Sequence, residues 1–283
     1  MAIGPRGYVS IAELVVYIPA LVLAFIVCSR HGFNRTLGWV FTVVLCLVRI
    51  IGSICQLVTY SNHSTDLLQA TIIIDSIGIS PLLLSTLGML VDWIRFRETP
   101  TFSVKQFRIV QLFITLGLIF SIVGGTDGTP SSTGAIKSST MSQVAIILYI
   151  VSFVAMVYIL VISSQNRPSV PGQERRIPIA VALAFPFIMV RLLYSILVVF
   201  IHNHIFSIIN GNVPVFVCMA AIEEFIVVVD CLLLGFSLNK LEPDQVGDLS
   251  GRPWKRGKKQ KKNPSRRQER VAQYDATELN NGR

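Results

Sequence analysis

The chain has 283 residues, of which 52% are hydrophobic and only 14% are charged, and its formal net charge is +9. Soluble domains carry charge at about 25% of their positions, so this composition excludes an ordinary soluble enzyme or binding domain. The net charge does not by itself indicate a nucleic-acid partner, because twelve of the 25 Lys and Arg residues follow Leu238 at the end of the chain.

Seven stretches of mostly apolar residues follow one another along the chain. The hydrocarbon core of a bilayer takes about 20 helical residues to cross, so each stretch predicts one membrane span. The predicted fold is therefore all-α, a polytopic bundle of seven transmembrane helices. The spans are predicted at Val9 to Cys28, Leu37 to Thr59, Leu67 to Asp92, Arg108 to Gly124, Gln143 to Ile162, Pro178 to Ile201 and Asn212 to Leu238.

The cations between the spans predict the orientation of the bundle. Lys and Arg accumulate in short cytoplasmic loops. Here they cluster in the first, third and fifth loops, whereas the second and sixth loops contain none. The N-terminus is therefore expected outside or in the lumen and the C-terminus in the cytosol. Residues 1–238 form the predicted transmembrane domain, and residues 239–283 form a disordered, basic cytosolic tail.

The tail is basic and poor in apolar residues from Trp254 to Arg267. Such a segment favours attachment to anionic lipid at the cytosolic surface of the membrane. A protein or sorting contact is the alternative, and a nucleic-acid partner is not expected. We expect a multi-pass protein of the endoplasmic reticulum, because lipophilic intermediates and the oxidases that act on them commonly share that membrane.

Ionisable residues occur inside several of the predicted spans. At the centre of a bilayer such a residue costs about 2.5 to 3.5 kcal/mol on insertion scales, and it usually faces a partner or an interior cavity. Counting residues along each span places four of them in one layer near the middle: Arg49, Arg191, Glu223 and Glu224. Four polar residues lie nearer the outer side: Glu13, Asp75, Gln56 and Tyr194.

The acids in the spans outnumber the arginines. Because Arg stays protonated and a carboxylic acid can take up a proton, some of these acids are expected to be neutral. A neutral carboxyl group can donate a proton, and an ionised one can collect it later. Glu223 and Glu224 lie about 100° apart around their helix, so at most one of them is expected to point into the bundle.

Two other interpretations of the charged layer remain open. In the first, Arg49 and Arg191 form ion pairs that hold helices together and there is no chemistry. In the second, the layer lines a cavity that binds a ligand without turnover. The octets LVRIIGSI around Arg49 and MVRLLYSI around Arg191 are alike, which is consistent either with an internal duplication or with chance similarity between apolar segments.

Four segments of the spans carry a resemblance to known proteins: VRIIGS in the second, ISPLLLSTLGMLVDW in the third, IMVRLLYS in the sixth and AAIEEFIVVVD in the seventh. From Tyr8 to Leu238 the chain resembles a group of fungal integral membrane proteins. It is similar to the membrane-bound terpene cyclases of the ascofuranone type. The resemblance implies closure of a prenyl or epoxidised prenyl chain on an aromatic or polyketide head, but it assigns no catalytic position.

The functional hypothesis combines this resemblance with the charge argument. A membrane-embedded terpene cyclase is expected to take a lipophilic substrate from the bilayer and to need no cofactor or metal. Glu223 or Glu224 would protonate the chain, and Asp75 or Glu13 would accept the final proton. The expected substrate-binding residues are Arg49, Arg191, Tyr194 and Gln56. The alternative is a seven-helix receptor or small-molecule transporter that uses the same charged layer.

Overall fold

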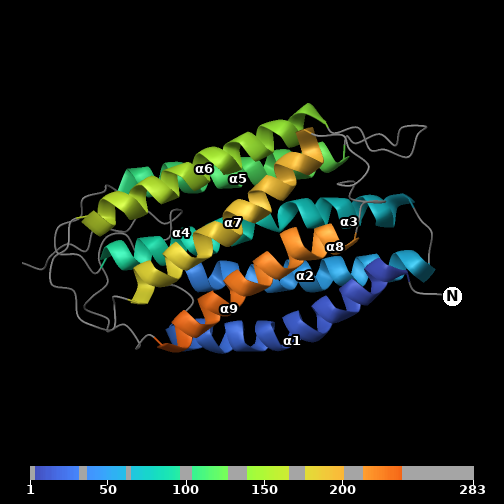
Figure 1. Cartoon of the computed structure of the whole chain (residues 1–283), viewed down its shortest axis with the longest axis horizontal. Helices are drawn as coiled ribbons and strands as arrows, with labels where there is room; N and C mark the ends of the chain where they lie inside the picture. The colour runs from blue at the N-terminus through green and yellow to red at the C-terminus, as the bar shows by residue number, and fades with distance from the viewer. Residues whose placement is uncertain are drawn as a thin grey trace, which may run out of the picture. The chain divides into compact units, whose positions relative to one another are not determined.

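The computed structural model describes residues 4–31, 37–61, 65–95, 104–126, 139–165, 176–200 and 213–237, and these ranges are almost entirely helical (Figure 1). The all-α prediction is confirmed for this part of the chain. The helices are α1 (Pro5–His31), α2 (Leu37–Ser61), α3 (Thr65–Ile77), α4 (Ile79–Arg95), α5 (Val104–Thr126), α6 (Thr140–Gln165), α7 (Arg176–Phe200), α8 (Val213–Phe216), the π-helical turn η2 (Val217–Ala221) and α9 (Ile222–Ser237).

Within the described ranges, six helical stretches are long and apolar enough to cross a membrane. They are Pro5–Arg30, Gly38–Ser61, Gln69–Ile94, Lys105–Thr126, Thr140–Ser164 and Arg176–Phe200, which correspond to the first six predicted spans. The described part of the seventh predicted span is divided into α8, η2 and α9. The predicted basic tail, residues 239–283, lies outside the described residues.

The outer surface of these helices carries many large apolar side chains. On α1 the exposed side chains include Ile11, Val15, Ile18 and Val22. On α6 they include Val154. Soluble proteins rarely expose so many large apolar side chains to water. This surface is suited to contact with lipid acyl chains, as expected of a multi-pass membrane protein.

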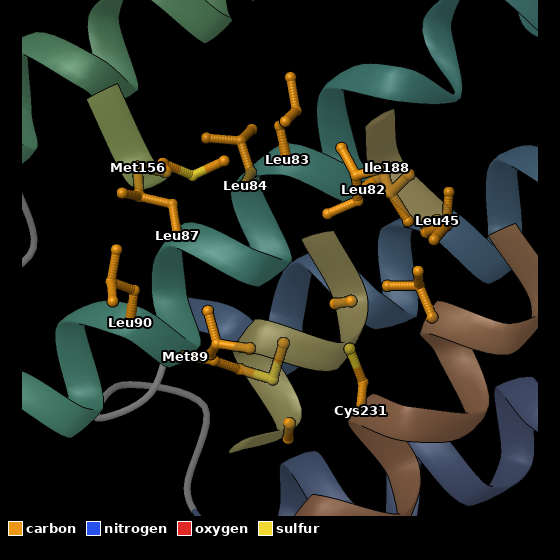
Figure 2. Close-up of a cluster of buried hydrophobic side chains, with 14 of the residues drawn as sticks. Leu45, Leu82, Leu83, Leu84, Leu87, Met89, Leu90, Met156, Ile188 and Cys231 are labelled. Atoms are coloured by element: carbon orange, nitrogen blue, oxygen red, sulfur yellow. The ribbon is translucent and has the colours of Figure 1, made fainter. Parts of the chain in front are cut away.

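Helix α4 lies at the centre of the packing. All residues from 78 to 90 are buried, because α4 contacts α2 on one side and α5, α6 and α7 on the others (Figure 1). Figure 2 shows its leucines, among them Leu83 and Leu90, within a cluster that also contains Met156 of α6 and Ile188 of α7. We call this cluster the apolar core.

The remaining contacts bring the last helix, α9, beside helices from both the beginning and the end of the chain. Helices α1 and α2 pack against each other, as do α5 and α6, and α9 packs against α7, α1 and α2. The last helix is therefore in contact with the first two and with α7. This closure brings residues that are far apart in sequence into one layer.

The third predicted span, Leu67 to Asp92, is not one continuous helix. It is interrupted at Gly78, between α3 and α4. Pro81 has no backbone N–H, so it cannot donate to the carbonyl of Ile77 four residues earlier, and the Ser80 hydroxyl donates to that carbonyl instead, at 3.0 Å. The sequence predicts a kink at Ser80-Pro81, and the structure places the interruption two to three residues earlier.

Candidate functional site: a buried ionic cluster

Four charged side chains from four helices meet where α3 and α4 join. Arg49 of α2 donates through Nε to Glu224 Oε2 of α9 and through Nη1 to Asp75 Oδ1 of α3, at 3.1 Å. Arg191 of α7 donates through Nε to Glu224 Oε1 at 2.7 Å. We call Arg49, Arg191, Glu224 and Asp75 the ionic cluster.

The ionic cluster is almost closed to its surroundings. Glu224 is 0% exposed, and Arg49 and Arg191 are each 3% exposed. The side chain of Asp75 is 23% exposed, which makes it the accessible member. Removing charges from water is costly unless each one is paired and hydrogen-bonded, and Glu224 meets this requirement because each of its oxygens accepts from a different guanidinium group.

The interruption at Gly78 makes room for the ionic cluster. A methyl group on Gly78 would lie 3.1 Å from Arg49 Nη2 and 3.2 Å from Glu224 Oε1, so a side chain here would press on the ion pair. The interruption also leaves the backbone carbonyl of Asp75 available to a side chain, and Arg191 Nη2 donates to it at 3.0 Å. A broken helix at bilayer depth is tolerated where such groups are satisfied inside the protein.

The turn η2 lies immediately before α9 and ends two residues before Glu223. Because a π-turn contains one residue more than an α-turn, it shifts the position that faces the bundle after it. Glu224 is the residue that points inward, while Glu223 is only half-buried on another face, in agreement with their 100° separation. Glu223 Oε2 is buried without a hydrogen-bond partner among the described residues.

Glu13 lies beside the ionic cluster on α1. Its Oε2 accepts a hydrogen bond from the Ser53 hydroxyl of α2 at 2.6 Å, and its Oε1 is buried without a partner in the described ranges. The hydroxyl of Tyr17, one turn further along α1, is likewise buried and unpartnered there. The Tyr17 ring forms a T-shaped pair with Phe225 of α9, with the ring centroids 6.4 Å apart.

A second aromatic pair lies on the Arg191 side of the cluster. The guanidinium carbon of Arg191 is 5.6 Å from the centroid of the Tyr194 ring. Tyr194 meets Phe216 of α8 at 6.3 Å between centroids, and Arg6 of α1 lies over the other ring of this pair at 6.0 Å. Aromatic rings therefore flank the ionic cluster on two sides.

The structure gathers most of the residues that the sequence singles out. Arg49, Arg191, Glu224 and Asp75 are joined directly, and Glu13 and Tyr194 are adjacent. Gln56 is half-buried on α2, and the contacts described for the cluster do not include it. By depth along its span Phe185 is also expected near the charged layer, and its ring pairs with that of Phe153 of α6, with the centroids 5.5 Å apart.

Three residues of the site were not predicted from the sequence: Gly78, Ser53 and Tyr17. Gly78 is an ordinary glycine among apolar residues until Arg49 and Glu224 are placed beside it. For the other two, a signal was present: Ser53 follows Arg49 by four residues, and Tyr17 follows Glu13 by four. Residues four apart share a helix face, so both lie on the polar faces that the charged residues define.

The geometry allows ion pairing, proton exchange and stabilisation of positive charge. Glu224 is a fixed anion, the arginines are fixed cations, and Glu13 and Asp75 are carboxyl groups that each have fewer described partners. Among the described residues, no group of three His, Cys, Asp or Glu side chains is arranged to hold a metal ion. The described side chains of the site supply acids, bases and aromatic rings.

The fold and the site together define a multi-pass helical membrane protein with a buried ionic cluster between its helices. The chain belongs to the family described as domain of unknown function DUF7702, whose family model matches residues 3–241. This match spans all of the described helices. No curated protein and no solved structure shows significant similarity to the chain.

Proposed function

We propose that this protein is a membrane-embedded terpene cyclase that closes rings in the prenyl or epoxy-prenyl chain of a meroterpenoid in fungal secondary metabolism. The observation that carries the proposal is that the carboxyl groups in one buried layer differ in their number of partners and in their exposure. Glu224 is saturated by two guanidinium groups, whereas Asp75 is partly exposed and joined to Arg49 through one oxygen. Carboxyl groups in such different environments favour different protonation states and roles.

A cyclisation of this kind needs a proton, a place for positive charge and a base. A proton added to the terminal alkene or epoxide of the chain creates a cation, a carbon–carbon bond closes the ring, and loss of a proton ends the reaction. The mass of the product equals that of the substrate, because the proton consumed is returned. The ring of Tyr194, over which the Arg191 guanidinium lies, and the anion of Glu224 favour positive charge near the cluster.

The geometry favours Asp75 and Glu13 for the transfer of this proton. The sequence predicts Glu223 or Glu224 as the donor, but Glu224 must lose contact with an arginine before it can carry a proton. Glu223 faces away from the cluster. We therefore propose that Asp75 and Glu13 exchange protons with the substrate and that Glu224 stays ionised. Arg49 and Arg191 keep the carboxylates in place.

Turnover tests this function directly. Membranes carrying the protein are incubated with an epoxidised farnesyl aromatic compound, and the products are analysed by mass spectrometry after chromatography. We expect an isomer of unchanged mass. Asp75→Asn should remove about 99% of the product because general acid–base catalysis typically contributes about 100-fold or more. Asp230→Asn changes a carboxyl group on α9 outside the cluster and should leave product formation intact. Unaltered substrate with the native protein would refute the cyclase.

The variant Glu223→Gln decides between the two assignments of the proton donor. If Glu223→Gln abolishes product while Asp75→Asn retains it, the donor predicted from the sequence is the correct one and the geometric assignment is wrong. Expression in the membrane fraction, measured by immunoblot, serves as the control for both variants.

The orientation, the seventh span and the compartment belong to the same proposal. We propose seven spans with the N-terminus luminal, the C-terminus cytosolic and the protein in the endoplasmic reticulum, with the tail on anionic lipid. A glycosylation acceptor sequence placed on an N-terminal extension should be modified, whereas the same sequence appended after Arg283 should not. Modification of the C-terminal acceptor would reverse this topology.

One observation favours a second function, that of a small-molecule transporter or receptor. Transporters often bind substrate at bilayer depth where a helix is interrupted and backbone groups are available. Here the interruption at Gly78 presents the Asp75 carbonyl to Arg191. Uptake that depends on pH or sodium in proteoliposomes, with no isomer formed, would identify a transporter. Coupling of the cytosolic loops to a signalling protein would identify a receptor.

A further inference from the structure

The packing of α1 against α2 has a defined register. Ser53 of α2 donates to Glu13 of α1. Further along, Val27 of α1 and Trp39 of α2 both reach Gly235 of α9. Moving forward along α1 therefore corresponds to moving back along α2, as in an antiparallel pair. In this register Tyr17, one turn after Glu13, lies opposite Arg49, one turn before Ser53.

Three polar atoms in this register have no hydrogen-bond partner among the described residues. They are Glu13 Oε1, the Tyr17 hydroxyl and Arg49 Nη2, and all three are buried. Tyr17 is 1% exposed, and in the antiparallel register of α1 and α2 it lies level with Arg49 and one turn from Glu13. Native proteins rarely leave buried polar atoms unpaired, so three in one place indicate a partner that belongs there.

The chemistry of the three atoms specifies this partner. Arg49 Nη2 only donates, a carboxyl oxygen can accept, and the Tyr17 hydroxyl does either. A hydroxyl group matches the set, because it has one hydrogen for Glu13 and lone pairs for the two donors. An ether or a ketone has no hydrogen to give to Glu13, and a hydrocarbon satisfies none of the three.

The surroundings favour a lipophilic molecule as the source of this hydroxyl. Glu13 is only half-buried, and the neighbouring outward positions on both helices, Ile11 and Ile18 on α1 and Ile54 on α2, are exposed apolar side chains. The polar atoms thus lie just inside an apolar seam that borders the bilayer. A molecule with an apolar tail can place its hydroxyl inside and its tail along the seam.

We propose that Glu13, Tyr17 and Arg49 form a binding site for the hydroxyl group of a lipophilic alcohol or phenol. The inference rests on the proposed function in one respect: the hydroxyl is that of the substrate's head. It narrows the chemistry, since Glu13 then holds the head and Asp75 is the carboxyl group that gives the proton to the chain and takes it back.

A matched pair of ligands tests the site without turnover. The purified full chain in detergent is titrated with farnesol and with farnesyl methyl ether, and binding is followed as the shift in thermal unfolding midpoint. Farnesol should bind about tenfold more tightly, because the ether cannot donate to Glu13. Tyr17→Phe removes a hydroxyl that donates to the oxygen of both ligands and should weaken the binding of both by about tenfold, whereas Tyr149→Phe, a change at another buried tyrosine, should leave their affinities unchanged.

The outcomes separate this site from the cyclase. Equal binding of farnesol and its ether, or unchanged affinity for both in Tyr17→Phe, overturns the site. Absence of binding by both compounds also overturns it and indicates that ordered water fills the position. If farnesol is preferred and no isomer forms in the turnover assay, the site stands and only the proposed chemistry fails.

Discussion

The ionic cluster and the apolar core lie in the same helical bundle, yet they stabilise the fold in different ways. The side chains of the apolar core around Leu83 and Leu90 would be in an apolar environment in lipid as well as in the bundle. The core therefore stabilises the bundle through close packing of side chains rather than through removal of apolar surface from water. Lipid cannot replace the partners of Arg49, Arg191 and Glu224. The core therefore accounts for compactness, and the ionic cluster determines which helix faces meet.

The largest expected effect comes from removing the centre of the ionic cluster. Glu224→Ala removes the anion that the two buried guanidinium groups share, and breaking a buried pair in this way costs about 3 to 5 kcal/mol. Thermal or denaturant unfolding of the purified protein in detergent measures the loss. Glu223→Ala, one position away on another face, should cost less than about 1 kcal/mol. Similar losses from both changes would contradict the arrangement described.

A smaller effect is expected in the apolar core. Leu90→Ala on α4 removes a fully buried side chain, and the cavity left behind should destabilise the protein by about 2 to 3 kcal/mol. Leu183→Ala on α7 is the matched control, because Leu183 is exposed on the lipid-facing surface and the change should fall within about 0.5 kcal/mol. The same unfolding measurement compares them, and an equal loss for Leu183 would argue against the packing.

Much of the arrangement could be predicted from residue order, and the missing part has a physical reason. Runs of apolar residues mark the helices because bilayer thickness fixes their length. Depth counting placed Arg49, Arg191 and Glu224 in one layer. It does not determine which faces meet, since 175 residues separate Arg49 from Glu224 and their contact depends on how α2 and α9 rotate against each other.

The interruption at Gly78 illustrates a different limit. Pro81 predicts an irregular helix from the local sequence. The position of the break depends on Arg49 and Glu224, which come from other helices and need space beside Gly78. The turn η2 is similar, because no residue of Val217–Ala221 predicts a π-turn. Its effect on the direction of the following side chains is recognised only from the inward position of Glu224. Local sequence therefore predicts that a helix is present more reliably than it predicts helix defects imposed by tertiary contacts.

Gly78→Ala probes the space between the two regions. Its methyl group would lie 3.1 Å from Arg49 Nη2 and 3.2 Å from Glu224 Oε1, and overpacking of this kind costs about 1 to 2 kcal/mol. The loss should shrink when Glu224→Gln is also present, because the neutral amide holds the arginines less firmly and they can move. A double-mutant cycle of unfolding free energies measures this coupling. Strict additivity would show that Gly78 acts independently of the cluster.

The smallest expected effect concerns a single hydroxyl at the edge of the cluster. Ser53→Ala removes the hydrogen bond that joins α2 to Glu13 of α1, and the expected loss is about 1 kcal/mol. Thr115→Ala is the control, because that hydroxyl bonds only to the carbonyl of Gln111 within its own helix and its removal should change the unfolding free energy by less than about 0.5 kcal/mol. A larger loss at Ser53 shows that the polar layer extends to α1. Equal losses would confine it to the four charged residues, because the bond between helices would then contribute no more than one within a helix.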